Sequence, residues 1–352
     1  MDFWGRSLTE LSRFLAGLPS VDLADPFVSE RDTSAWRDHA EKMNHLFRQF
    51  AVRHARPAFL WARANLGSLR STRSVFYPFS GPDFMFARLI YPAATTYVLC
   101  GLEACSPFPG WNALSEHEAA GGLDGIRTGL AHFLNHSYFI TQQMRDNHAG
   151  TWLEGALPFL LVLIARMGHT VEGADQVRLE DDGTPVLSPL DQSAPGLRIR
   201  LLRKGKLQSL FYFQQDLRDS FCPPDGPFLK FLRRLERPGV FAKCGSYLLH
   251  EPNFAHLRDY VFTHCSGVVQ DPSSIPYRTF VERGWKVHFH GNYVRTLPVF
   301  HRYEQPDLNR AYATPSSGVK PLNFGIGYLT DHRTTSLLIA KPHFEPALIA
   351  EL

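Results

Sequence analysis

The sequence has few cysteines and little excess of charge. Its 352 residues include five cysteines, and no two of them form a C-x-x-C pair, so the sequence predicts neither a zinc ribbon nor a disulfide framework. The 37 Lys and Arg residues nearly balance the 34 Asp and Glu residues, which gives no general attraction to nucleic acids or acidic membranes. We therefore expect reduced thiols and no nucleic-acid partner.

Long apolar runs are also missing. The longest one, residues 156–165, is about half of the roughly 20 residues that a membrane-spanning helix needs, and Arg166 ends it. The first residues carry the charges of Asp2, Arg6 and Glu10 where a signal peptide would be apolar. The sequence therefore predicts no transmembrane segment and a cytoplasmic protein, or an exported one if a leader has been removed.

Several catalytic motifs are absent. The chain contains no H-E-x-x-H, no G-x-S-x-G, no Walker loop and no aromatic-basic RNA signature. These absences disfavour nucleophile-elbow hydrolases and P-loop enzymes.

The sequence is rich in residues that build a hydrophobic core. Hydrophobic residues make up 44% of the chain, with 27 Phe and 12 Tyr, so it has enough apolar surface to fold. The pattern predicts an α/β protein whose mixed sheet contains β-loop-α-β units, with a helical N-terminal segment and a strand-rich C-terminal half. Helices are expected over 34–50, 153–167 and 253–262, a hairpin over 197–214, and strands over 74–79, 95–102, 239–243, 266–270, 285–290, 322–328 and 336–340.

No low-complexity linker divides the chain. We therefore expect residues 1–352 to form one compact α/β protein. A tentative boundary separates residues 1–168, which hold the helical segment and the first β-α-β unit, from the strand-rich residues 169–352.

The first candidate site is the loop 80–84, which follows a predicted strand. Gly81 permits close approach of backbone to a ligand, and Asp83 either caps the next helix or faces the ligand. Glu103 ends the next strand 20 residues after Asp83, a spacing typical of the carboxylate that binds ribose in Rossmann-type nucleotide and methyl-donor sites. The glycine fingerprint of such sites is absent, so a capped turn and a surface acid remain the alternative.

The second candidate site combines two polar loops, 243–247 and 270–278, that follow predicted strands. Lys243 beside Ser246 can activate a hydroxyl group, and Asp271 at a strand end can act as a general base or bind a metal. The alternative is ordinary turn chemistry in the second loop and a simple ion pair for Lys243.

Two histidines suggest a metal site. His288 and His290 are two residues apart on a predicted strand, so their imidazoles lie on the same face. The sequence identifies no third ligand, and histidines are common on half-buried strands.

Four segments resemble an uncharacterised family of bacterial proteins: VFYPFSGPDF (75–84), TYVLCGLE (96–103), QDPSSIPYR (270–278) and PLNFGIGY (321–328). The resemblance covers most of the chain and implies that these loops belong to one site. It implies no activity. Some members of the family begin with a secretory leader, which bears on the location of the protein.

These observations lead to one main hypothesis, an enzyme that transfers a group to or from a small polar or anionic substrate in a cleft formed by strand-end loops. A non-catalytic protein that binds a ligand or partner, possibly at the cell envelope, is the alternative. The sequence identifies no cofactor. The expected catalytic residues are Asp83, Lys243 and Asp271, the expected ligand-binding residues are Tyr77, Ser80, Gly81, Glu103, Ser246, Tyr277 and Arg278, and the expected metal ligands are His288 and His290.

Overall fold

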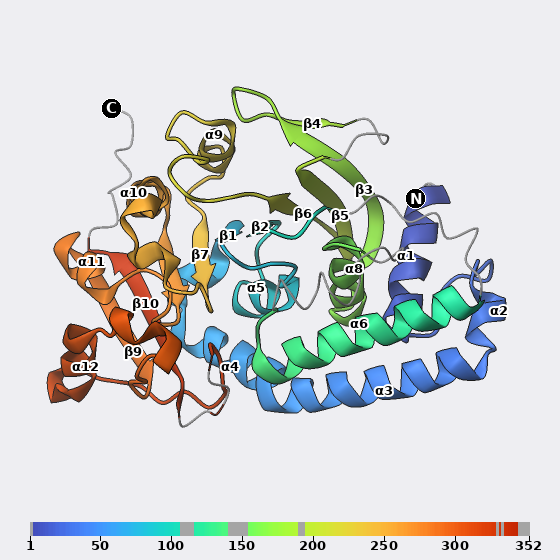
Figure 1. Cartoon of the computed structure of the whole chain (residues 1–352), viewed down its shortest axis with the longest axis horizontal. Helices are drawn as coiled ribbons and strands as arrows, with labels where there is room; N and C mark the ends of the chain where they lie inside the picture. The colour runs from blue at the N-terminus through green and yellow to red at the C-terminus, as the bar shows by residue number, and fades with distance from the viewer. Residues whose placement is uncertain are drawn as a thin grey trace.

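A computed structural model of the chain describes residues 3–105, 116–139, 154–188, 194–328, 331 and 334–343. Within this part, ten strands form one sheet in the order β4-β3-β5-β6-β2-β1-β7-β8-β10-β9 (Figure 1). The strands are β1 (Ser74–Tyr77), β2 (Thr96–Gly101), β3 (Thr170–Leu179), β4 (Pro185–Leu187), β5 (Gly196–Arg203), β6 (Lys206–Gln214), β7 (Gly239–Ala242), β8 (Gly267–Gln270), β9 (Trp285–Gly291) and β10 (Ser336–Pro342). The two halves distinguished in the sequence share this sheet.

The centre of the sheet is parallel. Strands β6, β2, β1, β7 and β8 all run in one direction. Counted along the chain, these parallel strands are the third, second, first, fourth and fifth, which is the Rossmann order. The chain therefore moves outward in one direction from β1 and then in the other from β7, so a topological switch point lies between these two strands.

Antiparallel strands extend both edges of the sheet. On one side β5 pairs with β6 and β3, and β3 pairs with β4. On the other side β10 lies antiparallel between β8 and β9. The sheet is therefore mixed, as the sequence predicts.

Helices cover both faces of the sheet because the central strands are apolar on both sides. Val75 and Tyr77 of β1 belong to one buried cluster, and Phe76 between them belongs to another, as the alternation of side chains along a strand requires. The first face carries α1 (Phe3–Leu15), α3 (Ser34–Phe50), α4 (Arg56–Asn65), α5 (Phe84–Ile90), α6 (Glu116–His136) and α8 (Leu157–Arg166), and the second carries α9 (Pro227–Arg233), α10 (Ala255–His264) and α11 (Tyr277–Glu282). Two further helices are α2 (Val28–Arg31) and α12 (Pro306–Ala313).

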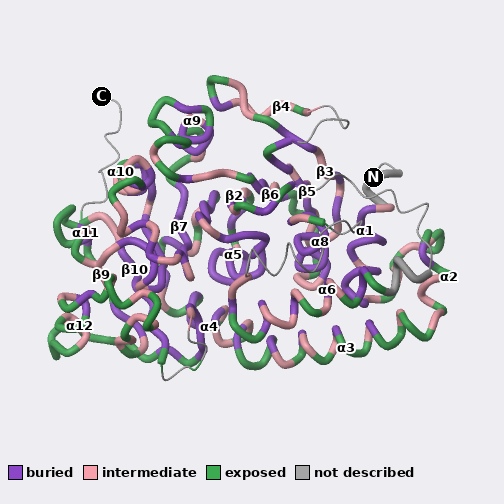
Figure 2. The backbone as a smooth tube through the Cα atoms, viewed as in Figure 1, coloured by how far each residue is buried: buried purple, intermediate pink, exposed green. Residues whose placement is uncertain are grey.

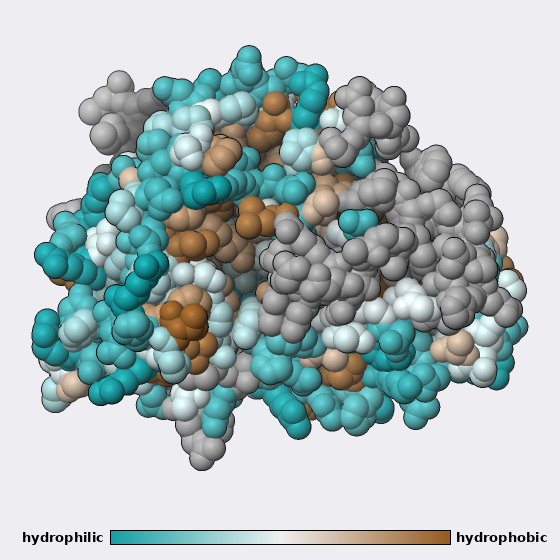
Figure 3. Space-filling model, in the orientation of Figure 1, coloured by the Kyte–Doolittle hydropathy of each residue, from teal (hydrophilic) through white to brown (hydrophobic). Residues whose placement is uncertain are grey.

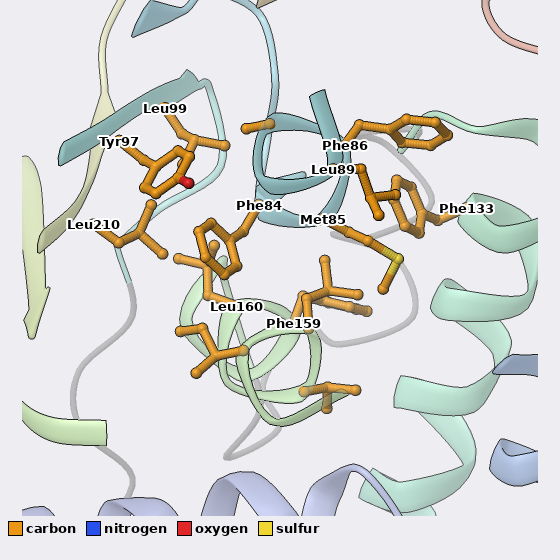
Figure 4. Close-up of a cluster of buried hydrophobic side chains, with 14 of the residues drawn as sticks. Phe84, Met85, Phe86, Leu89, Tyr97, Leu99, Phe133, Phe159, Leu160 and Leu210 are labelled. Atoms are coloured by element: carbon orange, nitrogen blue, oxygen red, sulfur yellow. The ribbon is translucent and has the colours of Figure 1, made fainter. Parts of the chain in front are cut away.

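The largest core lies around α5. Phe84 of this helix packs edge-on against Tyr97 of β2. Phe159 of α8 and Phe133 of α6 lie on other sides of α5 (Figure 4). All four side chains are fully buried, and every residue of α5 is buried (Figure 2). Burial of each such side chain contributes about 1.5 to 3 kcal/mol, so this core fixes α5 and the loop before it.

Most of the predicted elements are confirmed. Helix α3 spans the predicted residues, and the Thr33 hydroxyl caps it by accepting from Trp36 N. Pro158 lies in the first turn of α8, where its missing N–H costs nothing. The hairpin over 197–214 is present as β5 and β6. The sequence also predicts a break in the helical pattern over 147–151, and these residues lie outside the described part of the chain.

The strand predicted over 322–328 is wrong. None of the residues 322–328 is in a strand. The nearest contact with the sheet is a single bridge between Lys320, just before this segment, and His290. Leu322, Phe324 and Ile326 are buried, so their alternating pattern reflects burial against the core rather than pairing in a sheet. Among the described residues, no helix has the length and the apolar character that crossing a membrane requires.

Candidate functional site

A cavity of about 370 Å³ lies at the carboxyl ends of the central strands. Its walls come from the loops that follow four parallel strands: Phe79, Ser80 and Gly81 after β1, Leu102 and Glu103 after β2, Gln215 to Arg218 after β6, and Cys244 to Ser246 after β7. Figure 3 shows apolar side chains gathered at the surface over the middle of the sheet. In open α/β sheets a ligand binds at this edge, beside the switch point.

Glu103 places a carboxylate in the wall of this cavity. It is 4% exposed, and one of its carboxylate oxygens accepts a 3.0 Å hydrogen bond from the Tyr212 hydroxyl. A Cβ on Gly101 would lie 2.2 Å from that same oxygen, Oε2, and a Cβ on Gly81 would lie 3.6 Å from it. Gly101 therefore leaves the space that the folded-back Glu103 side chain occupies, whereas a Cβ on Gly81 would make an ordinary contact with it.

Asp83 joins three elements behind the cavity. Its Oδ1 accepts a 3.0 Å hydrogen bond from Phe86 N and so caps α5. Its Oδ2 accepts from the Tyr77 hydroxyl at 3.0 Å and lies 2.9 Å from Lys243 Nζ. Burial and the Asp83 carboxylate both raise the pKa of Tyr77 well above its usual value. The Tyr77 phenol therefore stays protonated and acts as a donor.

Lys243 is the partner of Asp83 and lies almost wholly inside the protein. Both side chains are 1% exposed. The ammonium also donates to the Ser137 carbonyl and lies 4.5 Å from the centre of the Phe86 ring. An ion pair with such complete hydrogen bonding holds β7, the end of α6 and the loop after β1 together.

The loop after β7 has an uncommon backbone. Cys244, Ser246 and Tyr247 adopt φ angles of 52°, 50° and 57°, a region that costs non-glycine residues about 1 to 2 kcal/mol each. The backbone N–H groups of residues 244 to 247 donate to Asp271, Ser273, Tyr328 and the Ser273 carbonyl, in that order. Since all four are used within the protein, this loop is no oxyanion hole as it stands.

Asp271 anchors this strained loop. Its Oδ2 accepts from Cys244 N at 2.9 Å, and its Oδ1 accepts from Ser273 N at 3.0 Å and from Ser273 Oγ at 2.6 Å. Burial raises the pKa of Asp271, although the hydrogen bonds from Ser273 and Cys244 oppose that shift. The carboxylate therefore positions the wall of the cavity from behind.

The Ser246 hydroxyl is bound by Tyr328 rather than by Lys243. Ser246 N and Ser246 Oγ both lie 2.9 Å from the Tyr328 hydroxyl, which donates to the Cys244 carbonyl at 3.0 Å. Because the tyrosine proton is used on that carbonyl, Ser246 Oγ is the donor of their shared hydrogen bond. The arrangement supports the loop and does not activate Ser246 as a nucleophile.

The structure brings most of the predicted site together. Tyr77, Ser80, Gly81, Glu103, Lys243 and Ser246 line the cavity, and Asp83 and Asp271 lie directly behind it. Ser80 has a structural contact there, because its Oγ bonds to the backbone of Cys100 in β2.

Tyr277 and Arg278 lie outside this cavity, so their expected place in it is corrected. They begin α11, where the Tyr277 ring packs on Phe289 and Arg278 pairs with Glu282 one turn further on. Helix α11 begins six residues after Asp271, and this short loop directs its first turn away from the switch point.

The predicted metal ligands share a face of β9 but differ in surroundings. His288 is exposed, whereas His290 is buried and accepts a 3.1 Å hydrogen bond from Trp61 Nε1 at its Nδ1. Burial lowers the pKa of both imidazoles, that of His290 to about 4. The described part of the chain has no group of three His, Cys, Asp or Glu residues able to hold a metal ion.

The sequence analysis missed the wall formed after β6, residues Gln215 to Arg218, and the aromatic side chains of Tyr138 and Phe254. The hairpin of β5 and β6 gave no sign that β6 also pairs with β2 in parallel. That pairing is what brings residues 215–218 to the same edge as Glu103.

The fold and the cavity define an α/β protein with Rossmann strand order and a pocket of mixed polar and apolar lining at its switch point. Comparisons of the chain with protein-family models, curated proteins and solved structures gave no match.

Proposed function

We propose that this cavity binds the adenosine part of S-adenosylmethionine and that the protein is a group-transferring enzyme. The observation that carries the proposal is the position of the Glu103 carboxylate at the carboxyl end of β2, next to the first strand of the Rossmann sheet. An acidic side chain at this place accepts hydrogen bonds from the ribose hydroxyls of a bound nucleoside.

The strand order supports a methyl donor. Counted from the first parallel strand, β9 is the sixth strand and β10, which lies antiparallel between β8 and β9, is the seventh. Rossmann-like methyltransferases share this order of seven strands. A shared strand order concerns the fold alone and assigns no reaction, so the argument depends on the site.

The loop after β1 favours a ligand without phosphate groups. In dinucleotide sites the N-terminus of the following helix holds the pyrophosphate. Here the Asp83 carboxylate occupies the N-terminus of α5 and is fully buried. The Asp83 carboxylate already uses the Phe86 N–H group at this helix N-terminus, so that group is not available to a pyrophosphate, whereas S-adenosylmethionine has no phosphate.

The cavity has the size and lining that such a ligand needs. Its volume of about 370 Å³ lies in the usual range for small-molecule sites. Leu102 and Leu217 offer apolar surface for a base beside Glu103. S-adenosylmethionine supplies an electrophilic methyl group when bound. The residues of this chain would hold its ribose and exclude water around it.

Isothermal titration calorimetry with S-adenosylmethionine and S-adenosylhomocysteine tests the proposal, with NAD as the phosphate-bearing comparison. We expect one site per chain for the first two, little binding of NAD, and binding weakened about tenfold or more by Glu103→Gln, because a charge-assisted hydrogen bond is lost. Glu282→Gln, an exposed control, should bind as the unchanged protein does. Absence of binding, or equal affinity in Glu103→Gln, would overturn the proposal.

One observation favours a non-catalytic binding protein as a second candidate. The side chains expected to act as acids, bases or nucleophiles, Lys243, Ser246 and Asp271, are each held by partners within the protein. S-adenosylmethionine that binds and stabilises the protein, with no S-adenosylhomocysteine formed over a panel of small polar acceptors, would favour this candidate.

A further inference from the structure

We propose that the protein has a second site, independent of the first, which binds a small phosphate-bearing anion. This site lies at the opposite ends of the central strands from the first cavity. A cavity of about 420 Å³ lies where the central strands begin. Arg237 and Ser266 precede β7 and β8, Lys286 and His288 come from β9, and Lys341 lies near the end of β10.

The lining of this cavity is basic. Arg237, Lys286 and Lys341 supply three cations, and His288 and His343 supply two imidazoles. Ser68, Thr72 and Ser266 add hydroxyl groups, and no carboxylate is among the described residues that line the cavity. Cations together with hydroxyl donors are the groups that recognise phosphate oxygens.

The register of the sheet places like charges directly against each other. Lys286 of β9 is the partner of Lys341 of β10 in this antiparallel pair, and His288 is opposite Ile339. Partners in an antiparallel pair point to the same face, and two like charges there are destabilising. His288, two residues after Lys286, adds its imidazole to that face. An anion between the two ammonium groups would reverse the sign of this interaction.

The surroundings of His288 and Lys286 are also positively charged. Burial is the main cause of the lowered pKa of His288, and the nearby positive charges of Lys286, Lys341 and Lys320 lower it further. Among the described residues, no ion pair includes Arg237 or Lys286. The charges of Arg237 and Lys286 are therefore not neutralised by an ion pair within the described part of the chain.

Two lining groups are prepared for a ligand. Lys341 Nζ donates to the Leu66 carbonyl at 3.1 Å, which holds the ammonium in place beside the cavity. Ser266 Oγ is shielded from solvent and has no hydrogen-bond partner among the described residues, although buried hydroxyl groups are normally paired. A phosphate oxygen in the cavity would give Ser266 a partner.

The limited volume favours a small ligand over a polymer. The volume is in the range of small-molecule sites, whereas nucleic acids are bound along extended basic surfaces. We therefore assign the site to an anion of one or a few phosphate groups. Inorganic pyrophosphate is the simplest probe of that chemistry.

Isothermal titration calorimetry of the full chain with pyrophosphate tests the assignment. We expect saturable binding at one site, weakened about tenfold or more by Lys286→Gln and retained by Lys286→Arg, since loss of one charge-assisted contact is of that order. Lys206→Gln removes the same charge from the exposed first residue of β6, and should leave binding unchanged. Lys286 is exposed, so Lys286→Gln is expected to fold, which its unfolding temperature checks.

Three results would overturn the assignment. The first is the absence of saturable binding, and the second is an equal loss in Lys206→Gln and Lys286→Gln, which would indicate a non-specific effect of charge. The third is binding of a single-stranded oligonucleotide or of anionic phosphatidylserine vesicles that is tighter than the binding of pyrophosphate and equally sensitive to Lys286→Gln. That result would mean that the site is a surface for a macromolecule or a membrane. None of these results bears on Glu103 and the first cavity.

Discussion

Lys243 Nζ lies 2.9 Å from Asp83 Oδ2, and both side chains are 1% exposed. This ion pair connects β7 to the loop after β1 across the switch point of the sheet. Two residues 160 positions apart in the sequence thus form the floor of the candidate site.

The buried pair should be expensive to break from one side. We expect Asp83→Asn or Lys243→Met to lower the free energy of unfolding by about 3 to 5 kcal/mol, because each leaves an uncompensated buried group. The double variant should lose less than the sum of the two. Urea unfolding measures all three. The exposed pair of Lys42 and Asp38, at 2.7 Å, is the matched control and should contribute little to the free energy of unfolding, because solvent screens it. Additive losses in the buried pair would contradict the prediction.

Tyr328 should hold the strained loop in place. Its hydroxyl binds Ser246 N, Ser246 Oγ and the Cys244 carbonyl. We expect Tyr328→Phe to cost about 1 to 3 kcal/mol and to speed hydrogen exchange at the Ser246 amide. Mass spectrometry of peptides covering 244–247 measures the exchange. Tyr277→Phe, outside the cavity, should leave hydrogen exchange at the Ser246 amide unchanged. Equal exchange in both variants would show that Tyr328 does not hold the loop.

Gly101 should be intolerant of any side chain. A Cβ there would lie 2.2 Å from Glu103 Oε2 and 2.7 Å from the Tyr212 hydroxyl, so Gly101→Ala must displace the carboxylate. We expect a loss of about 1 to 3 kcal/mol from overpacking, measured by urea unfolding. Gly121→Ala is the control, because nothing lies within 4 Å of its Cβ and alanine in a helix gains about 0.5 to 1 kcal/mol. If Gly101→Ala were as stable as the unchanged protein, the placement of Glu103 would be wrong.

Buried histidines should make the protein less stable in mild acid. Burial lowers the pKa of His39 and of His169 from 6.5 to about 4, and within the described part of the chain each ring has an Nδ1 with no hydrogen-bond partner. Between pH 6.5 and 4 the unfolded chain therefore binds protons that the folded chain does not, so the free energy of unfolding falls as the pH falls.

His39→Gln isolates one of these contributions. Urea unfolding at several pH values gives the slope of the free energy of unfolding against pH. Between pH 6.5 and 4 this slope should be smaller in His39→Gln than in the unchanged protein, by up to about 1.4 kcal/mol per pH unit, the value for one proton. His301→Gln, at an exposed position, is the control. An unchanged slope in His39→Gln would mean that the His39 pKa is not lowered in the folded state.

Local patterns were enough to predict much of the fold. The spacing of apolar residues over 34–50 and the two predicted β-α-β units gave α3, β1, β2, β7 and β8, because these signals depend on neighbours in the chain. The run over 322–328 was misassigned because alternation reports burial, and burial here comes from the core rather than from a sheet partner.

The candidate site was predicted in part for the same reason. Asp83 and Glu103 stand out from the sequence because each ends a local unit, and the alternative that Asp83 caps a helix is also confirmed. The pairing of Lys243 with Asp83, and of Ser246 with Tyr328, has no local signal. Both contacts arise only when distant strands align.

The sequence by itself therefore determined the α/β class, the main elements and the polar loops at the strand ends, since these follow from short-range periodicity and turn chemistry. The tertiary structure alone decided the Rossmann order, the cavity and the basic pocket at the opposite edge. These features depend on which strands pair and in what register, as the opposition of Lys286 and Lys341 shows. Pairing between distant segments is selected by the packing of the whole core, which no short stretch of sequence contains.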